Sequence, residues 1–225
     1  MQEIEEHHLT VARTARYFTL GETGATAEEI WFALHGYAQL AGAFARYCQP
    51  LADPRRLVVV PEALSRFYLG DHTKPAGPDA RIGASWMTRE DRQADIADYV
   101  QYLDLLYDDL LERSGGKISV HVLGFSQGTA TATRWLARGR ARADRLILWG
   151  APMPSDLEPA DFEKLRSVEI VLVAGSQDQY LTPKVLAADE ARLTQAGARF
   201  RTVRYDGGHA LDATTLKQLA DAVTT

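Results

Sequence analysis

A serine between two glycines is the residue whose setting most clearly suggests chemistry. Ser126 lies in Gly124-Phe125-Ser126-Gln127-Gly128, after an apolar run and before a run of small residues. Where a strand turns tightly into a helix, the two flanking glycines avoid collisions and the serine hydroxyl is raised from the sheet edge. The pentapeptide alone is a weak signal, but in this setting it predicts that Ser126 is a nucleophile.

A serine nucleophile needs a base, and the base needs an acid that orients it. Of the six histidines in the sequence, His209 alone follows Ser126. Asp178 lies between Ser126 and His209 in the sequence, after another apolar run, and is the favoured acid. Asp156 and Asp206 stay open as alternatives. The order serine, aspartate, histidine is one of the known orders for such a set.

Hydrolysis through a serine also needs N–H groups that stabilise the negative oxygen of the tetrahedral intermediate. One donor should be the backbone N–H of Gln127, the residue after the nucleophile. The other should come from the loop after the first central strand, which reads His35-Gly36-Tyr37. We therefore predict the backbone N–H of Tyr37 as the second donor.

The composition limits the classes of protein that the chain can be. It has 225 residues, of which 46% are hydrophobic and 24% are charged, with a formal net charge of −5. These values suit a globular domain covering residues 1–225 and do not favour a nucleic-acid partner. The single cysteine, Cys48, excludes an internal disulfide framework and is expected to fill apolar space. The start of the chain is acidic and no apolar run approaches the ~18 residues of a membrane span, so we expect a cytoplasmic protein.

Apolar runs bounded by glycine or proline alternate with helical patterns along the chain. This alternation predicts an α/β fold with a mostly parallel central sheet and helices on both faces. Residues 9–20 predict one or two antiparallel edge strands. The central strands are expected at 30–34, 57–60, 117–123, 145–149, 168–173 and 199–205, and the helices at 37–48, 89–113, 127–138, 183–196 and 212–222.

Residues 62–88 show no clear period and contain several glycines and prolines. A long irregular segment in a compact domain is often functional, so we expect a flap over the site. Four side chains in it are candidates for an apolar acyl-binding site, with ordinary packing as the alternative: Phe67, Tyr68, Trp86 and Met87.

Other polar residues predict structure rather than chemistry. His121 lies inside a predicted strand and is expected to be a hydrogen-bonded core histidine. Five arginines near the helix after Ser126 predict a solvated helix end rather than an anion-binding patch. They are Arg134, Arg138, Arg140, Arg142 and Arg145. The sequence has no H-E-x-x-H, C-x-x-C or G-x-G-x-x-G motif, so we expect no metal and no cofactor.

Six short motifs, in order, resemble those of the phospholipase/carboxylesterase family of α/β-hydrolases, which includes the acyl-protein thioesterases. The resemblance extends from about residue 30 to the end of the chain. It implies an α/β-hydrolase fold without a large lid domain and without a cofactor. It also implies Ser126, Asp178 and His209 as the catalytic triad, with Tyr37 and Gln127 as the oxyanion donors. The motifs are His35-Gly36, Pro61, Ser85-Trp86, Gly124–Gly128, Gly175–Asp178 and Gly208-His209.

The chain departs from the family pattern in two places that concern the substrate. The family's first loop continues as Gly-x-Gly-Asp, whereas here His35-Gly36 is followed by Tyr37-Ala38-Gln39. The family's Trp-Phe-Asp is Trp86-Met87-Thr88.

These observations predict a serine carboxylic-ester hydrolase that forms an acyl-enzyme with small or short-chain acyl esters. One alternative is a thioesterase or lysophospholipase that acts on longer acyl chains. Another, from a different class, is a non-catalytic binding protein on a hydrolase scaffold. The expected partner is a small-molecule ester, and the sequence leaves a homodimer open.

Overall fold

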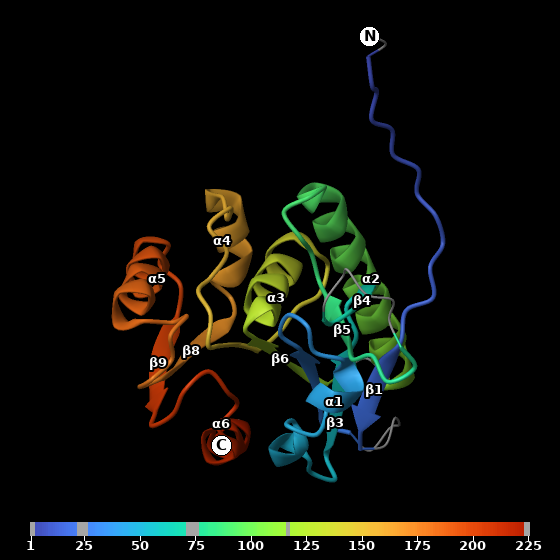
Figure 1. Cartoon of the computed structure of the whole chain (residues 1–225). Helices are drawn as coiled ribbons and strands as arrows, with labels where there is room; N and C mark the ends of the chain where they lie inside the picture. Colours follow the sequence, from blue (N-terminus) through green and yellow to red (C-terminus); the bar gives the residue numbers. More distant parts are fainter. Residues whose placement is uncertain (1–2, 22–26, 71–76, 116–117, 223–225) are drawn as a thin grey trace.

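A seven-stranded sheet forms the centre of the protein (Figure 1). The computed structural model describes residues 3–21, 27–70, 77–115 and 118–222. In space the strands follow the order β1-β3-β2-β6-β7-β8-β9. β1 is antiparallel to β3, and all other neighbours in this sheet are parallel. The bounds are β1 Tyr17–Leu20, β2 Glu29–Leu34, β3 Arg56–Pro61, β6 Ser119–Phe125, β7 Arg145–Trp149, β8 Glu169–Gly175 and β9 Phe200–Tyr205.

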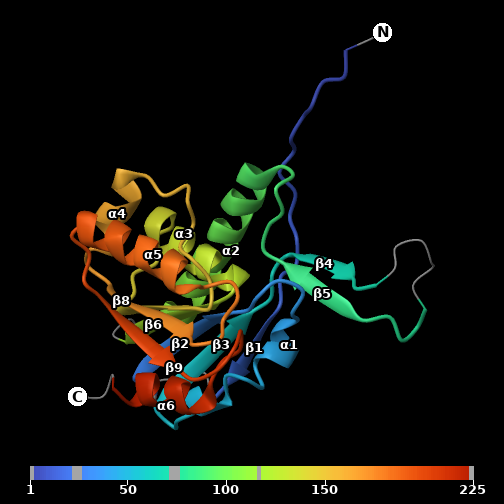
Figure 2. The same ribbon diagram turned by 60° about the vertical axis from the view of Figure 1, so that its left-hand side comes forward.

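Helices cover both faces of this sheet, as the sequence predicts (Figure 2). One face carries α2 (Arg92–Arg113), α3 (Gln127–Arg138), α4 (Pro159–Leu165) and α5 (Pro183–Gln195). The other face carries α1 (Ala41–Phe44), the 3-10 turn η1 (Gln49–Leu51) and α6 (Ala213–Asp221). Each layer of helices encloses its own apolar core, because alternate residues of a strand point to opposite faces. In β2, Ile30 and Phe32 belong to the first core and Trp31 and Ala33 to the second.

The six predicted central strands are confirmed, with small shifts at their ends. β2, β3 and β7 are fully buried runs, which is expected of strands covered on both sides. In the predicted edge region 9–20, only β1 forms a strand. The predicted helix 37–48 contains only α1, because a turn and an isolated bridge at Gln39 precede it. The elements η1 and α4 were not predicted.

The predicted irregular segment 62–88 is partly regular. It contains β4 (Ser65–Tyr68) and β5 (Ile82–Ser85), which pair as an antiparallel hairpin that projects from the sheet (Figure 2). Residues 71–76 of this segment lie outside the described residues. The base of the hairpin is joined to the loop after β2. The Ala38 N–H donates to the Ala84 carbonyl at 2.9 Å, and the Ala84 N–H donates to the Gln39 carbonyl at 3.3 Å.

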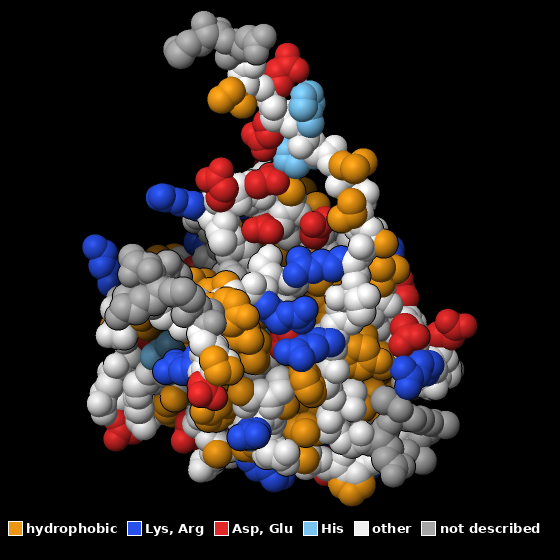
Figure 3. Space-filling model, turned by 45° about the vertical axis from the view of Figure 1, so that its right-hand side comes forward, with side chains coloured by type: hydrophobic (Ala, Val, Ile, Leu, Met, Phe, Trp, Pro, Cys, Tyr) orange, Lys and Arg blue, Asp and Glu red, His pale blue; other side chains and the backbone are white. Residues whose placement is uncertain are grey.

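Before β1, the chain runs as an extended arm that projects from the molecule (Figure 3). Ile4 and Leu9 in this arm are almost completely exposed. At its base, the Arg16 guanidinium binds the buried Glu62 carboxylate through two hydrogen bonds of 2.7 and 2.9 Å. Among the described helices, none combines the length and the apolar character needed to cross a membrane.

Candidate active site

Ser126 occupies the sharp turn between β6 and α3. Its φ of 54° and ψ of −118° are unusual for a residue with a side chain. The turn leaves no space for larger neighbours, since a Cβ on Gly124 would lie 2.4 Å from the Gly128 carbonyl oxygen. A Cβ on Gly128 would lie 2.2 Å from the Leu34 carbonyl oxygen. Strained backbone of this kind persists only where the surroundings fix it, and it is typical of functional sites.

The structure brings the three residues of the predicted triad together. Ser126 Oγ lies 3.0 Å from His209 Nε2, and His209 Nδ1 lies 3.0 Å from Asp178 Oδ2. The Asp178 side chain is fully buried, whereas the His209 side chain is 20% exposed. These contacts connect three loops that follow β6, β8 and β9, because parallel strands place their carboxyl ends at one edge of the sheet.

Asp178 is held so that one carboxylate oxygen faces the histidine. Its other oxygen, Oδ1, accepts hydrogen bonds from the backbone N–H groups of Tyr180 at 2.8 Å and Leu181 at 3.2 Å. Gly150 lies beside the pair, and a Cβ there would be 3.1 Å from both Asp178 Oδ2 and His209 Nδ1. Gly150 also has a φ of +74°, so two independent constraints favour glycine at this position.

The two alternative acids have other partners. Asp156 binds the guanidinium groups of Arg92, Arg134 and Arg138. Burial alone would raise the pKa of Asp156, but the hydrogen bond and charge of Arg134, together with the charge of Arg92, lower it. Asp206 accepts a hydrogen bond of 2.7 Å from Ser176 Oγ. The geometry therefore selects Asp178 as the partner of the histidine.

The loop after β2 packs directly against Ser126. A Cβ added to Gly36 would lie 3.1 Å from Ser126 Cβ. The Gly36 N–H donates to Gln39 Oε1, and the Ala38 N–H donates to the Ala84 carbonyl. Between them, the Tyr37 N–H has no hydrogen-bond partner within the part of the chain that the structure describes. The same holds for the Gln127 N–H at the start of α3.

Two N–H groups without a partner among the described residues, on segments next to Ser126, fit what a developing oxyanion requires. The N-terminus of α3 adds a partial positive charge at the same place. The N–H groups of Tyr37 and Gln127 thus stay the predicted donors, while the Gly36 and Ala38 amides on either side of Tyr37 hold the loop.

His35 is a structural part of this loop whose role the sequence analysis did not predict. The ring is completely buried. Its Nε2 accepts a hydrogen bond of 3.0 Å from the Ala63 N–H, so the proton of the neutral ring is on Nδ1. Nδ1 then donates to the Gly36 carbonyl at 2.8 Å. Burial lowers the pKa of His35, which keeps the ring in this neutral, bridging form.

The side chain of Gln127 is also used, whereas the sequence suggested a role only for its backbone. Its amide nitrogen donates to Ser85 Oγ at 3.1 Å and to the Met87 carbonyl at 2.9 Å. Its Oε1 accepts from the Trp86 N–H at 3.1 Å. Gln127 therefore joins the start of α3 to residues 85–87, immediately beside Ser126.

Two aromatic rings flank the imidazole of His209. The centre of the buried Phe125 ring lies 5.0 Å from the centre of the imidazole, and that of Tyr180 lies 4.5 Å from it. Tyr180 is 57% exposed. One ring therefore supports the histidine from the interior, while the other contacts it from the solvent side.

The four predicted pocket residues differ in their surroundings. Trp86 is 3% exposed, and its indole N–H donates to the His35 carbonyl at 2.9 Å. Met87 is half-buried, with its sulfur 3.4 Å from Arg134 Nη1. Phe67 packs on Tyr37, with ring centres 5.4 Å apart, and Tyr68 is exposed. The structure thus places Phe67 next to the loop after β2 and Trp86 in the core.

Two structural expectations for polar residues were only partly correct. His121 is buried in β6, but neither ring nitrogen has a hydrogen-bond partner among the described residues; the ring packs on Trp31 with centres 4.7 Å apart. Four of the five arginines after Ser126 are held in ion pairs, and of these four only Arg140 is mostly exposed, at 61%. They pair with acidic residues of other elements: Arg134 with Asp156, Arg138 with Asp156 and Asp161, Arg140 with Asp104 and Asp108, and Arg145 with Glu169.

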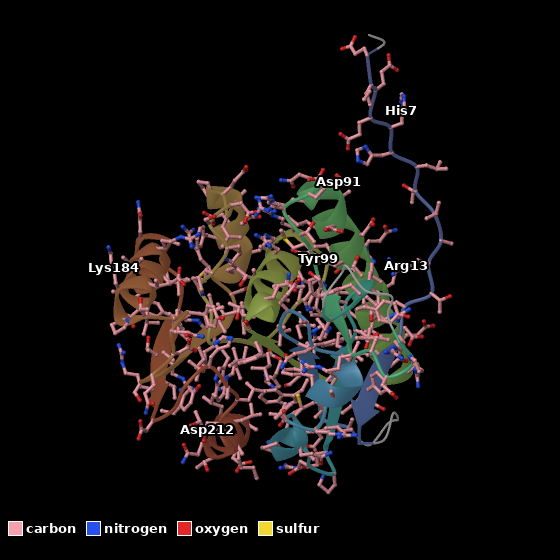
Figure 4. All side chains as sticks on the ribbon, viewed as in Figure 1. His7, Arg13, Asp91, Tyr99, Lys184 and Asp212 are labelled. Carbon is pink, nitrogen blue, oxygen red and sulfur yellow. The ribbon has the colours of Figure 1, made fainter. Side chains whose placement is uncertain are left out.

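Groups outside the site offer little further chemistry. Cys48 is completely buried, and burial raises the pKa of its thiol to about 12, so it remains protonated. One group of possible metal ligands occurs within the described residues. It consists of Glu6 and His8 in the extended arm and Asp91 before α2, all exposed. Asp91 is labelled in Figure 4. Exposed groups of this kind commonly bind no ion.

Comparison with solved structures identifies the fold. The chain is similar to esterase PE8, with 20% identity, a TM-score of 0.66 and coverage of 94% of this chain and 99% of that chain. It is also similar to Zea mays acyl-protein thioesterase 2, with 15% identity, a TM-score of 0.65 and coverage of 94% and 98%. A third similar structure is the Bacillus cereus carboxylesterase, with 11% identity, a TM-score of 0.64 and coverage of 93% of each chain.

No protein-family model and no curated protein matches the chain. At these identities, the structural likeness shows the fold alone. The chain has the α/β-hydrolase fold, without a large lid domain among the described residues. The similar structures are consistent with the resemblance to the phospholipase/carboxylesterase family that the sequence motifs suggest.

Proposed function

We propose that this protein is a serine carboxylic-ester hydrolase. One observation carries the proposal: Ser126 Oγ, His209 and the buried Asp178 form a continuous chain through two contacts of 3.0 Å. A binding protein would not need a nucleophile, a base and an orienting acid in this order. The unpaired N–H groups of Tyr37 and Gln127 beside Ser126 are further support.

The proposed reaction has two stages. Ser126 Oγ attacks the ester carbonyl carbon, while His209 Nε2 takes the hydroxyl proton. Asp178 holds the imidazole in the required tautomer and stabilises its positive charge. The N–H groups of Tyr37 and Gln127 bind the negative oxygen of the tetrahedral intermediate. The ester C–O bond then breaks, and His209 gives the proton to the departing alcohol.

Water completes the cycle by attacking the acyl-enzyme. His209 Nε2 takes a proton from this water, and a second tetrahedral intermediate forms at the same N–H groups. The bond between the acyl carbon and Ser126 Oγ breaks, and the serine regains its proton from His209. The products are a carboxylic acid and the alcohol, and the protein returns to its starting state.

We propose small or short-chain acyl esters as the substrates. Two of the four predicted pocket side chains support this choice, because Trp86 is packed in the core and the Met87 sulfur contacts the Arg134 guanidinium. These residues therefore do not form the open apolar wall that a long acyl chain requires. Hydrolysis of longer acyl thioesters is the second candidate, because the similar structures include an acyl-protein thioesterase.

Initial rates on p-nitrophenyl esters of increasing acyl length test both points. Wild-type protein should hydrolyse the short esters fastest. Ser126→Ala should lower kcat by on the order of 10⁶-fold, because the nucleophile is absent. The variant keeps a Cβ in the same turn, so its circular dichroism spectrum and melting temperature should match those of wild type.

Each departure from this pattern has a distinct meaning. A maximum at long chains, lost in Ser126→Ala, would favour the thioesterase or lysophospholipase alternative. Turnover that survives Ser126→Ala would contradict the proposed nucleophile. A wild-type protein that neither hydrolyses any ester nor reacts with an organophosphonate would favour the non-catalytic alternative.

A further inference from the structure

Tyr180 is a large, exposed aromatic residue in direct contact with the proposed base. Its ring centre lies 4.5 Å from that of His209, and the two rings are tilted by 59°. Despite this contact, 57% of Tyr180 remains accessible to solvent. The side chain therefore has a free surface beside the reacting atoms, and neither the triad nor the oxyanion donors make use of it.

The backbone of Tyr180 is fixed independently of its ring. Its N–H donates to Asp178 Oδ1 at 2.8 Å, and the neighbouring Leu181 N–H donates to the same oxygen. Leu181 is 3% exposed and belongs to the core. The ring is thus held over His209 by a rigid segment, and a substitution of the side chain leaves the hydrogen bonds to Asp178 in place.

The chemistry of the reaction determines which part of the substrate comes near this ring. In the first stage, His209 Nε2 gives its proton to the departing alcohol, so the alcohol oxygen must lie within about 2.6–3.2 Å of that nitrogen. The group attached to this oxygen then begins next to the imidazole. Tyr180 contacts the same imidazole and is open to solvent, so the alcohol group and the Tyr180 ring are both neighbours of His209.

We infer that Tyr180 is a specificity-determining residue that binds the alcohol part of the ester, and that it favours aromatic alcohols. This inference rests on the proposed function and adds the class of leaving group. An aromatic ring attracts another ring in offset or edge-to-face arrangements, and such pairs gain about three- to tenfold in binding beyond simple burial. A methyl group offers Tyr180 almost no surface.

The test compares two esters of one carboxylic acid, chosen as the acid of the fastest p-nitrophenyl ester. The methyl and the benzyl ester release alcohols of nearly equal acidity, so they differ mainly in the aromatic ring. Release of acid is followed with a pH indicator. Wild type should have the higher kcat/KM for the benzyl ester. Tyr180→Ala should lower kcat/KM for the benzyl ester about three- to tenfold, mainly through a higher KM. For the methyl ester, kcat/KM of the variant should stay within about twofold of the wild-type value.

Two control variants accompany this substitution. Tyr180→Phe keeps the ring and should retain the preference for the benzyl ester. Tyr47→Ala removes another tyrosine, 60% exposed and in the turn after α1, and should leave both esters unchanged. Their behaviour separates loss of the ring from a general effect of replacing a surface tyrosine.

Three outcomes would overturn the inference. An equal fall for both esters in Tyr180→Ala would mean that the ring only positions His209. Unchanged values for both esters would mean that the alcohol does not contact the ring. A wild-type protein without preference for the benzyl ester would mean the same. None of these results affects the proposed function, which fails instead if turnover survives Ser126→Ala.

Discussion

Replacing Gly36 with alanine tests whether the loop after β2 supplies an oxyanion donor. The added Cβ would lie 3.1 Å from Ser126 Cβ and from Gln39 Oε1, and 3.3 Å from Phe125 Cδ1. Contacts in this range require the neighbours to move by a few tenths of an ångström. Ser126 and Phe125 are fixed by β6 and α3, so the loop that carries the Tyr37 N–H should move instead.

The size of the effect follows from the value of one donor. Complete loss of an oxyanion donor raises the barrier by about 2.7–4 kcal/mol, which corresponds to about 10²–10³ in kcat. A shift of a few tenths of an ångström weakens the hydrogen bond without removing it. We therefore expect kcat for Gly36→Ala to fall by about 10- to 100-fold, with KM changed much less.

The assay is steady-state hydrolysis of the best p-nitrophenyl ester, with Gly77→Ala as the matched control. Gly77 lies in the part of the chain between β4 and β5, and a Cβ there would meet nothing within 4 Å. The control should keep wild-type kcat. If Gly36→Ala is folded and its kcat lies within twofold of wild type, the assignment of the Tyr37 N–H as an oxyanion donor is refuted.

Two further predictions concern stability. Asp104→Ala should lower the free energy of unfolding by about 3–5 kcal/mol in urea titrations, because this buried carboxylate accepts from the Trp135 indole and from the backbone N–H groups of Arg140 and Ala141. Asp108 lies one helical turn later and forms an exposed ion pair, so Asp108→Ala should lower the free energy of unfolding by less than about 1 kcal/mol. Equal losses of stability in the two variants would contradict the argument.

The second of these predictions concerns how the stability of the folded protein depends on pH. Burial lowers the pKa of His121 to about 4, from 6.5. The unfolded chain therefore binds the extra proton first, and stability should fall as the pH drops from about 6.5 to 4, by up to about 3 kcal/mol. His121→Phe should lose less stability than wild type over this range, and parallel pH profiles would refute the prediction.

Motifs with steric requirements proved the most predictable from the sequence. The glycines around Ser126 are required by close approaches of backbone atoms, so their spacing alone indicates the turn. The central strands are buried on both faces, which gives them unbroken apolar runs. Because all their carboxyl ends meet at one edge, the position of Asp178 after β8 and His209 after β9 was enough to predict that these residues meet.

Side-chain hydrogen bonds between distant segments could not be predicted in the same way. The amide of Gln127 binds Ser85 and Met87, about forty residues earlier in the chain. Any polar residue at position 127 would have looked equally suitable in the motif. The arginines in and after α3 were misinterpreted for a related reason, since their acidic partners come from α2, from α4 and the segment before it, and from β8. Charge spacing within one helix contains no information about such partners.

The amino ends of the parallel strands help to position the proposed triad through their contacts with α6. At that edge, Arg56 binds the Glu29 carboxylate at 2.9 Å and donates to the Ala220 carbonyl, while Arg145 donates to the Leu219 carbonyl at 3.0 Å. The two guanidinium groups therefore satisfy carbonyls in the last turn of α6, where positive charge is favourable.

The first turn of α6 is fixed as well, because the Asp212 side chain accepts from the Thr215 N–H at 2.7 Å. Asp212 comes only three residues after His209. The loop that carries His209 is thus anchored by β9 on one side and by a helix capped at both ends on the other. Two glycines precede His209 in this loop, which makes its backbone less restricted. The anchors on both sides therefore help to hold the 3.0 Å contact between His209 and Ser126. The buried charges far from Ser126 therefore support the position of His209, the proposed base.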